Sequence, residues 1–154
     1  MPTKVRSAGP EDAELVDTLV RELADHQDEG QYITVTVERW RELLADDAVT
    51  VLLAEHDGEP AGYVSAVRRI HLWTGREVLG LDDLYVRERF RGAGIGELLM
   101  LELARAAALP GRLTITWGMR TSNEGAQRFY ARLGASLNTK VLAAWPYDAY
   151  APRL

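Results

Sequence analysis

The chain has 154 residues, a length that suits one domain with its own hydrophobic core. Its hydrophobic fraction of 47% and charged fraction of 27% are ordinary for a globular protein, and no apolar run is long enough to cross a bilayer. The formal net charge of −5 argues against a general nucleic-acid binder, and a sequence with no cysteine and 3 histidines offers little from which to build a zinc site.

These features set the first expectations. We expect one domain over residues 1–154, no metal, no nucleic-acid partner and no membrane partner. Residues 1–6 lack the apolar core of a secretion signal, and a chain without cysteine has no disulfide framework that would suggest export. The expected location is therefore cytoplasmic.

The first part of the chain is typical of a strand followed by two amphipathic helices. Pro10 can open the first helix, because its missing N–H is tolerated in the first turn, and Thr36 can cap the second. An apolar stripe through Leu15, Leu19 and Leu23 gives the first helix a face to bury. The expected bounds are a strand over 4–8, a helix from 9 to about 25, a loop over 26–30 and a helix from 36 to about 46.

The middle of the chain predicts a set of strands. Asp57-Gly58 is a strong hairpin signal, and Trp73–Arg76 supplies a second turn. A helix follows Gly94, and Pro110-Gly111 ends it before another strand. A strand, a helix and a strand in succession imply that the two strands are parallel neighbours. The expected strands are 49–55, 61–70, 78–86 and 113–117.

The last part of the chain predicts one helix and a final strand. Thr121 and Asn123 are alternative caps for the helix, and Gly134 ends it. The β-prone run Val141–Trp145 predicts the final strand, after which Pro146 and Pro152 discourage regular structure. The buried face of the helix would carry Ala126, Phe129, Tyr130 and Leu133.

The stretch Arg91–Gly96 has the features of an anion-binding turn. Its glycines lie where a helix begins, so the unpaired N–H groups of the first helical turn can face outward, and the helix dipole adds positive potential there. A phosphate or pyrophosphate is the natural ligand. The Lys-Ser or Lys-Thr pair of a kinase-type phosphate loop is absent, and a dinucleotide fold would place its glycines after the first strand. The arginines that we expect to bring positive charge are Arg87, Arg89 and Arg91.

The run Arg91-Gly92-Ala93-Gly94-Ile95-Gly96 and the later run Asn123–Ala135 resemble the two motifs of the GCN5-related N-acetyltransferases. The resemblance implies an α/β (α+β), single-domain fold with element order β-α-α-β-β-β-α-β-α-β. Its central sheet would be mixed and mostly antiparallel, with the fourth and fifth strands parallel and splayed, and flanked by helices. More narrowly, Trp73, Leu81–Val86 and Phe129-Tyr130 are similar to the spermidine/spermine (diamine) acetyltransferase branch. That branch has Glu-Asp in place of Asp82-Asp83, and an acidic segment where this chain has 137–140.

The resemblance also implies roles for individual residues. Amine acetylation needs a base for the amine and a proton for the departing thiolate. The paired acids are candidates for the base, and a tyrosine, with an ordinary pKa of about 10, is a candidate donor to a thiolate. The implied roles are base for Asp82, acceptor binding for Asp83, general acid for Tyr130, pantetheine binding for Leu84 and Val86, pyrophosphate binding for Arg91, Gly92, Ala93, Gly94, Ile95 and Gly96, and cofactor binding near the thioester for Asn123.

Structural roles remain open for the same residues. The carboxylates can instead pair with Arg68 or Arg69, and Tyr130 can be a core residue. Because successive side chains of a strand point to opposite faces, we expect one of Asp82 and Asp83 to face the acceptor groove while the other bonds elsewhere.

The expected function is acetyl-CoA-dependent N-acetylation of a primary amine on a small cationic acceptor, such as a polyamine, a lysine analogue or an aminoglycoside. The alternatives are acetylation of a protein N-terminus or lysine, and a non-catalytic acyl-CoA-binding sensor. Direct transfer is expected, since no cysteine is present to carry an acyl group. A homodimer formed through residues 141–145 is expected, because a bare apolar edge strand invites pairing.

Overall fold

The computed structural model describes residues 2–109 and 111–154. Contacts within the chain define two compact units, residues 1–117 and 118–154, and each is described by itself. The expectation of a single domain over 1–154 stays a prediction. Pro110, the expected helix breaker, lies outside the described residues.

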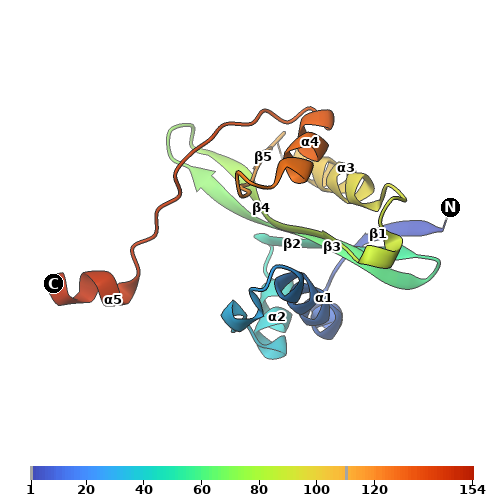
Figure 1. Ribbon diagram of the computed structural model, residues 1–154, viewed down its shortest axis with the longest axis horizontal. Helices are drawn as coiled ribbons and strands as arrows, with labels where there is room; N and C mark the ends of the chain where they lie inside the picture. Colours follow the sequence, from blue (N-terminus) through green and yellow to red (C-terminus); the bar gives the residue numbers. More distant parts are fainter. Residues whose placement is uncertain (1, 110) are drawn as a thin grey trace. The chain divides into compact units, whose positions relative to one another are not determined.

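The first unit is built on a mixed 5-stranded sheet with strand order β1-β2-β3-β4-β5 (Figure 1). The first four strands are antiparallel neighbours, and β4 and β5 are parallel. This sheet confirms the predicted fold class and the predicted parallel pair. The strands are β1 (Thr3–Ser7), β2 (Val49–His56), β3 (Glu59–His71), β4 (Arg76–Val86) and β5 (Thr114–Thr116).

Helices cover both faces of this sheet, with α1 and α2 on one face and α3 on the other (Figure 1). The predicted cap of α2 is confirmed, because the Thr36 hydroxyl accepts a hydrogen bond from the backbone N–H of Arg39. The α-helices are α1 (Ala13–His26), α2 (Val37–Leu44) and α3 (Ile95–Ala108), and short 3-10 helices span Pro10–Asp12, Gly30–Tyr32 and Glu88–Phe90.

The core follows from the alternation of side chains along β2. Val51 and Leu53 belong to the cluster packed with α1 and α2, while Leu52 and Ala54, which are equally buried, point to the α3 face. On that face α3 buries Leu99, Leu103 and their neighbours along its apolar stripe. Each fully buried leucine contributes roughly 1.5–3 kcal/mol. Two buried faces explain why β2 is apolar along most of its length.

The predicted hairpin between β2 and β3 is confirmed. Asp57 and Gly58 both have positive φ, 51° and 80°, the conformation that a two-residue hairpin turn of this hand requires. The turn sets the register that pairs His56 with Glu59. No helix within residues 2–109 or 111–154 combines the length and the apolar character needed to cross a membrane.

The second unit contains α4 (Glu124–Arg132), a short helix α5 (Tyr147–Tyr150) and a 3-10 helix over Ala151–Arg153. Of the two caps that the sequence allows for α4, the structure uses Asn123, whose side chain accepts from the backbone N–H of Ala126 at 3.1 Å. Gly134, with φ of 97°, follows the end of the helix as predicted.

The predicted strand over Val141–Trp145 is wrong. These residues form no strand in the described chain, and the side chains of Val141 and Leu142 are 97% and 96% exposed. The β-propensity of these side chains is a preference for a pleated surface. A strand forms only where a neighbouring backbone supplies its hydrogen bonds. The expectation of no regular structure after Pro146 is also wrong, because Pro146, with φ of −71°, is the N-cap of α5.

Candidate active site

The site is organised by a β-bulge in β4. Across the β3–β4 hairpin Ala66 pairs with Leu81 and Ser65 with Asp83, so Asp82 is an extra residue without its own partner. Such an insertion interrupts the strict alternation of side chains and bends the strand locally. The bulge explains why Leu81 and Tyr85 are buried on opposite faces although both carry odd numbers.

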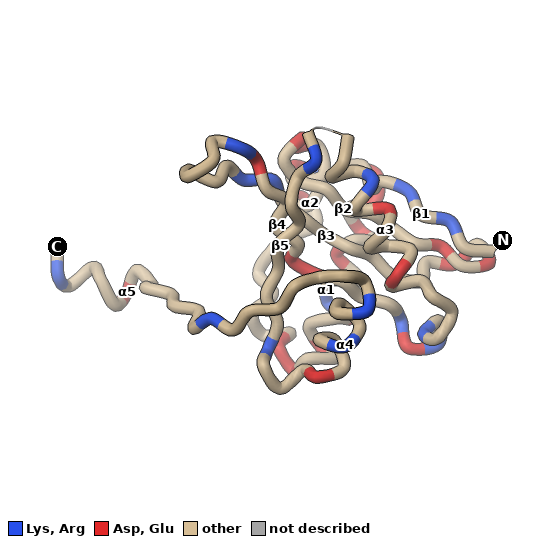
Figure 2. The backbone as a smooth tube through the Cα atoms, turned by 90° about the horizontal axis from the view of Figure 1, so that it is seen from above, with Lys and Arg blue, Asp and Glu red and all other residues tan. Residues whose placement is uncertain are grey.

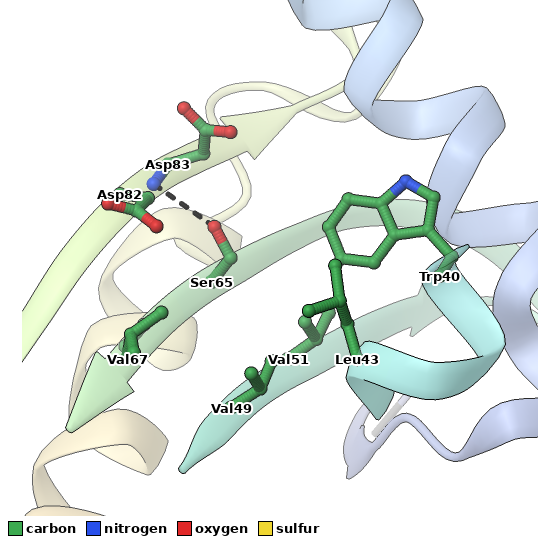
Figure 3. Close-up of a pocket in the computed structure, with 9 residues that line it drawn as sticks. Trp40, Leu43, Val49, Val51, Ser65, Val67, Asp82 and Asp83 are labelled. Carbon is green, nitrogen blue, oxygen red and sulfur yellow. Dashed lines mark hydrogen bonds between the residues drawn. The ribbon is translucent and has the colours of Figure 1, made fainter. Parts of the chain in front are cut away.

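Both acidic side chains therefore line one cavity, on the face covered by α2 (Figure 3). The expectation that only one of them would face the groove is wrong, because it assumed an unbroken strand. The cavity has a volume of about 140 Å³ and is lined by Asp82, Asp83, Ser65, Ala66, Val67, Val49, Val51, Trp40 and Leu43.

Asp83 is held in place by β3. Its carboxylate oxygen Oδ2 accepts a hydrogen bond from the hydroxyl of the fully buried Tyr63 at 3.0 Å, and its backbone N–H donates to Ser65 Oγ at 3.2 Å. Burial raises the pKa of the Asp83 carboxyl, the hydrogen bond from Tyr63 opposes that rise, and the charge of Asp82 adds to it. Asp83 is therefore a fixed carboxylate with one oxygen already engaged.

Asp82 is less constrained. Among the described residues no lysine or arginine lies within ion-pair distance of either Asp82 or Asp83, and the Asp82 carboxylate has no hydrogen bond. The alternative of pairing with Arg68 does not occur, since that guanidinium contacts Glu77 and the carbonyl oxygen of Asp47. Burial raises the pKa of Asp82. An uncompensated carboxylate with a raised pKa suits proton transfer or the binding of a cation.

The Tyr63 hydroxyl gives a first testable prediction. In Tyr63→Phe the hydrogen bond that lowers the pKa of Asp83 is lost, so that pKa should rise further. Ionised Asp83 would then be lost at higher pH, so the acid limb of the pH–rate profile should move to higher pH. Loss of the hydrogen bond should also lower the free energy of unfolding by about 1 kcal/mol. Both quantities are read from a pH series of initial rates and from urea denaturation.

Tyr85→Phe is the matched control. The Tyr85 ring packs edge-on against Tyr63 with 6.2 Å between centroids, but its hydroxyl donates to Glu22 instead, at 3.3 Å. This variant should lose comparable stability and keep the acid limb in place. If the acid limb moved by the same amount in both variants, the Tyr63–Asp83 contact would not determine the pH at which activity is lost.

The glycine-rich turn between β4 and α3 has the geometry of an anion site. Gly92 and Gly94 have φ of 85° and 78°, and a Cβ added at either would meet nothing within 4 Å. Gly94 is the N-cap of α3 and has no side chain to cap it. The first turn of α3, at Ile95, Gly96 and Glu97, thus has N–H groups without helical acceptors, beside open space.

The charge around the turn differs from the expectation. Arg87 forms a two-pronged ion pair with Glu22 on α1, at 2.9 and 2.7 Å, and Arg89 pairs with Glu59. Arg91 donates from Nε to the carbonyl oxygen of Val86 at 2.9 Å. Lys and Arg segments (blue) and Asp and Glu segments (red) are interspersed along the backbone trace in Figure 2. Of the expected cations, Arg91 is the one without a carboxylate partner among the described residues.

Among the described residues, the later part of the strand before the turn has no paired strand on one side. Pairing between β4 and β5 spans only Val78–Gly80 on β4, so the later part of β4, which includes Leu84 and Val86, extends beyond its parallel neighbour. An extended ligand that carries amide groups could hydrogen-bond to this unpaired edge, as an added strand would. The first unit thus brings together the paired acids, the strand edge and the glycine turn.

Asn123 and Tyr130 lie in the second unit. The Asn123 side chain caps α4, and Tyr130 is 8% exposed, with its ring edge-on to Phe129. Burial raises the pKa of the Tyr130 phenol. Among the described residues no group of three or more histidine, cysteine, aspartate or glutamate side chains has the arrangement of a metal site.

Sequence reasoning missed Tyr63 and Ser65. The turns at the two ends of β3 predict that it pairs with β2 and β4. The contact between Tyr63 and Asp83, however, depends on the bulge, which shifts the β3–β4 pairing by one residue. A polar residue such as Ser65 within the otherwise apolar stretch 61–67 is the signal that could have been followed.

The fold is similar to that of solved N-acetyltransferases. An aminoglycoside N-acetyltransferase solved in complex with CoA superimposes with a TM-score of 0.75, covering 92% of this chain and 93% of that one at 20% sequence identity. The sequence profile described as Acetyltransferase (GNAT) family matches residues 14–135. This chain belongs to that family.

Relatives in this family are similar over part or most of the chain. An uncharacterized N-acetyltransferase of Mycobacterium tuberculosis is 35% identical over 100 residues, which cover 65% of this chain and 61% of the relative. The match thus spans about three fifths of that relative's length. A thialysine N-epsilon-acetyltransferase of Caenorhabditis elegans is 29% identical over 121 residues, which cover 79% of this chain and 75% of the relative.

Proposed function

We propose that the protein transfers acetyl from acetyl-CoA directly to the primary amine of a small cationic acceptor. The observation that carries this proposal is the pair of uncompensated carboxylates, Asp82 and Asp83, in a cavity beside the strand that leads into the glycine turn. Family membership and the thialysine and aminoglycoside acetyltransferases among similar proteins support the reaction type.

The residues present fit acetyl-CoA. Open space in front of Gly92 and Gly94 admits a phosphate close to the backbone, and the N–H groups of the turn Arg91–Gly96 can donate to it. The unpaired edge of β4 at Leu84 and Val86 can accept the amide-bearing pantetheine arm, and Asn123 is proposed to bind near the thioester. When bound, acetyl-CoA supplies the acetyl group as a thioester.

Asp82 and Asp83 are proposed to have different roles: one binds the ammonium group and the other removes its proton. An alkylammonium with a pKa of about 10.4 is almost fully protonated at neutral pH and cannot attack a carbonyl carbon. Asp83, fixed by Tyr63, would hold the ammonium, and the freer Asp82 would take its proton, directly or through a water molecule. The neutral nitrogen would then bond to the acetyl carbon as the carbon–sulfur bond breaks, and it would release its second proton to water as the amide forms.

Tyr130 is proposed as the general acid for the departing thiolate. A thiol has an ordinary pKa of about 8.5, so a phenol whose pKa is raised by burial keeps its proton over the whole neutral range and can donate it when the thiolate forms. Tyr130→Phe should therefore lower kcat by roughly 10²–10⁴-fold while acetyl-CoA affinity stays nearly intact. Steady-state rates and calorimetry measure the two effects.

Phe129→Leu is the control for that variant. Phe129 is the ring neighbour of Tyr130 at 5.1 Å between centroids, and its loss perturbs the same helix without removing a hydroxyl. Similar losses of kcat in both variants would remove Tyr130 from the chemistry.

A panel of amines tests the function itself. Polyamines, lysine analogues, aminoglycosides and peptides are offered with acetyl-CoA, and released thiol is followed. Turnover of a small amine supports the proposal. Turnover of peptides alone favours the protein acetyltransferase, and tight acetyl-CoA binding without turnover favours the sensor.

The proposal includes a cytoplasmic, single-domain homodimer. The exposed apolar side chains of Val141, Leu142 and Trp145 supply a surface that a second copy could cover. Size-exclusion chromatography of the chain at the mass of a monomer, 17.2 kDa, would contradict the dimer.

A further inference from the structure

The cavity that holds the two acids is strongly asymmetric. Its polar groups, Asp82, Asp83 and Ser65, come from the β3–β4 hairpin, where the bulge lies (Figure 3). The rest of its wall offers neither a charge nor a hydrogen-bonding side chain oxygen. That apolar wall consists of Trp40, Leu43, Val49, Val51, Ala66 and Val67.

The arginine that follows the apolar wall on β3 is already paired. Arg68 follows Val67 on β3, donates to the carbonyl oxygen of Asp47 and lies 3.7 Å from Glu77. The lining carries no carboxylate besides Asp82 and Asp83. A second ammonium group at the apolar wall would therefore lose part of its hydration without gaining a carboxylate partner, which is costly.

A second cavity, of about 130 Å³, also reaches Asp83, and Glu29 lies in its wall. It does not include Asp82, and its wall is partly formed by Tyr32, which is 71% exposed. An amine whose proton passes to Asp82 must lie in the first cavity. The lining of that cavity therefore determines which hydrocarbon chain can be attached to the amino group.

Building on the proposed function, we propose that the acceptor is a monoamine. Its single ammonium group is held between Asp82 and Asp83, and its apolar alkyl or arylalkyl chain lies along the apolar wall formed by α2, β2 and β3. Burial of the alkyl or arylalkyl chain against this wall favours monoamines. Strongly hydrated polycations such as polyamines and aminoglycosides are disfavoured.

A homologous series of amines tests this selectivity. From ethylamine to hexylamine, kcat/KM should rise about threefold to fourfold per methylene until the apolar wall is covered. Pentylamine and diaminobutane have the same length and differ in one terminal methyl or ammonium group. Pentylamine should be preferred by at least about tenfold.

A charge placed on the wall should reverse the preference. Val67→Asp puts a carboxylate on the apolar wall at a position that is already 40% exposed, so folding should tolerate it. Ile70→Asp places the same charge on the same strand, at a 59% exposed residue outside the cavity. The ratio of pentylamine to diaminobutane kcat/KM should fall at least about tenfold in the first variant and stay unchanged in the second.

The outcomes separate this inference from the proposed function. Preference for diaminobutane over pentylamine, removed by Glu29→Gln, would place the alkyl chain in the second cavity and overturn the inference while acetylation stands. A kcat/KM that does not change from ethylamine to hexylamine would also overturn the inference. If no amine is acetylated, calorimetry of the same amines decides: tighter binding with each methylene supports the monoamine site, and the absence of binding overturns it together with the function.

Discussion

Asp82→Asn is expected to lower kcat at neutral pH by roughly 10²–10⁴-fold, the range that a positioned general base contributes. Asparagine cannot accept a proton, so the variant depends on the small fraction of acceptor that is already neutral. For an amine with a pKa of about 10.4 that fraction grows about tenfold per pH unit below the pKa. The rate of the variant should therefore climb with pH up to about pH 10.

The parent enzyme should behave differently. Burial raises the pKa of Asp82, so the ionised, proton-accepting form is lost at higher pH than for an exposed aspartate. Its activity should fall as pH drops through that raised pKa and level off above it. Initial rates from pH 5 to 10 in parent and variant measure both curves.

Two comparisons make the experiment specific. Asp83→Asn should mainly raise KM for the amine, because the fixed carboxylate is proposed to hold the cation. Asp47→Asn removes an exposed carboxylate that does not line the cavity and should change neither constant. A variant at Asp82 that keeps the parent's pH profile would contradict the assignment of the base.

The bulge at Asp82 shows where sequence reasoning stops. The pattern of residues predicted the strand, its two acids and the glycine turn after it, because each depends on local preferences and spacing. Whether both acids share a cavity depends on one inserted residue in the β3–β4 pairing, and that register is set by packing on both faces of the sheet. The same insertion brings Asp83 opposite Ser65 and within reach of Tyr63.

The arginines before the turn and the tail after α4 show the same limit. Arg87 and Arg89 have the right sequence positions to serve an anion, but partners distant in sequence, Glu22 and Glu59, lie close enough in the folded unit to pair with them. Likewise, the β-prone run 141–145 lacks a neighbouring strand in the described chain. Local sequence predicts what a segment can do, whereas its partners decide what it does.

Gly94→Gln should weaken acetyl-CoA binding at least about a hundredfold, equivalent to roughly 2.7 kcal/mol. The side chain would enter the open space in front of the first turn of α3, where the N–H groups are proposed to donate to the pyrophosphate. Part of any effect will be backbone strain, since a left-handed φ of 78° costs a residue with a Cβ roughly 1–2 kcal/mol.

Gly75→Gln isolates that strain. Gly75 lies in the β3–β4 turn with φ of 66°, and a Cβ there also meets nothing within 4 Å. Both variants should lose similar free energies of unfolding in urea, and only Gly94→Gln should lose heat of acetyl-CoA binding in calorimetry. Because both positions have a left-handed φ and open space around an added Cβ, normal acetyl-CoA affinity in a folded Gly94→Gln protein would refute the pyrophosphate site at this turn.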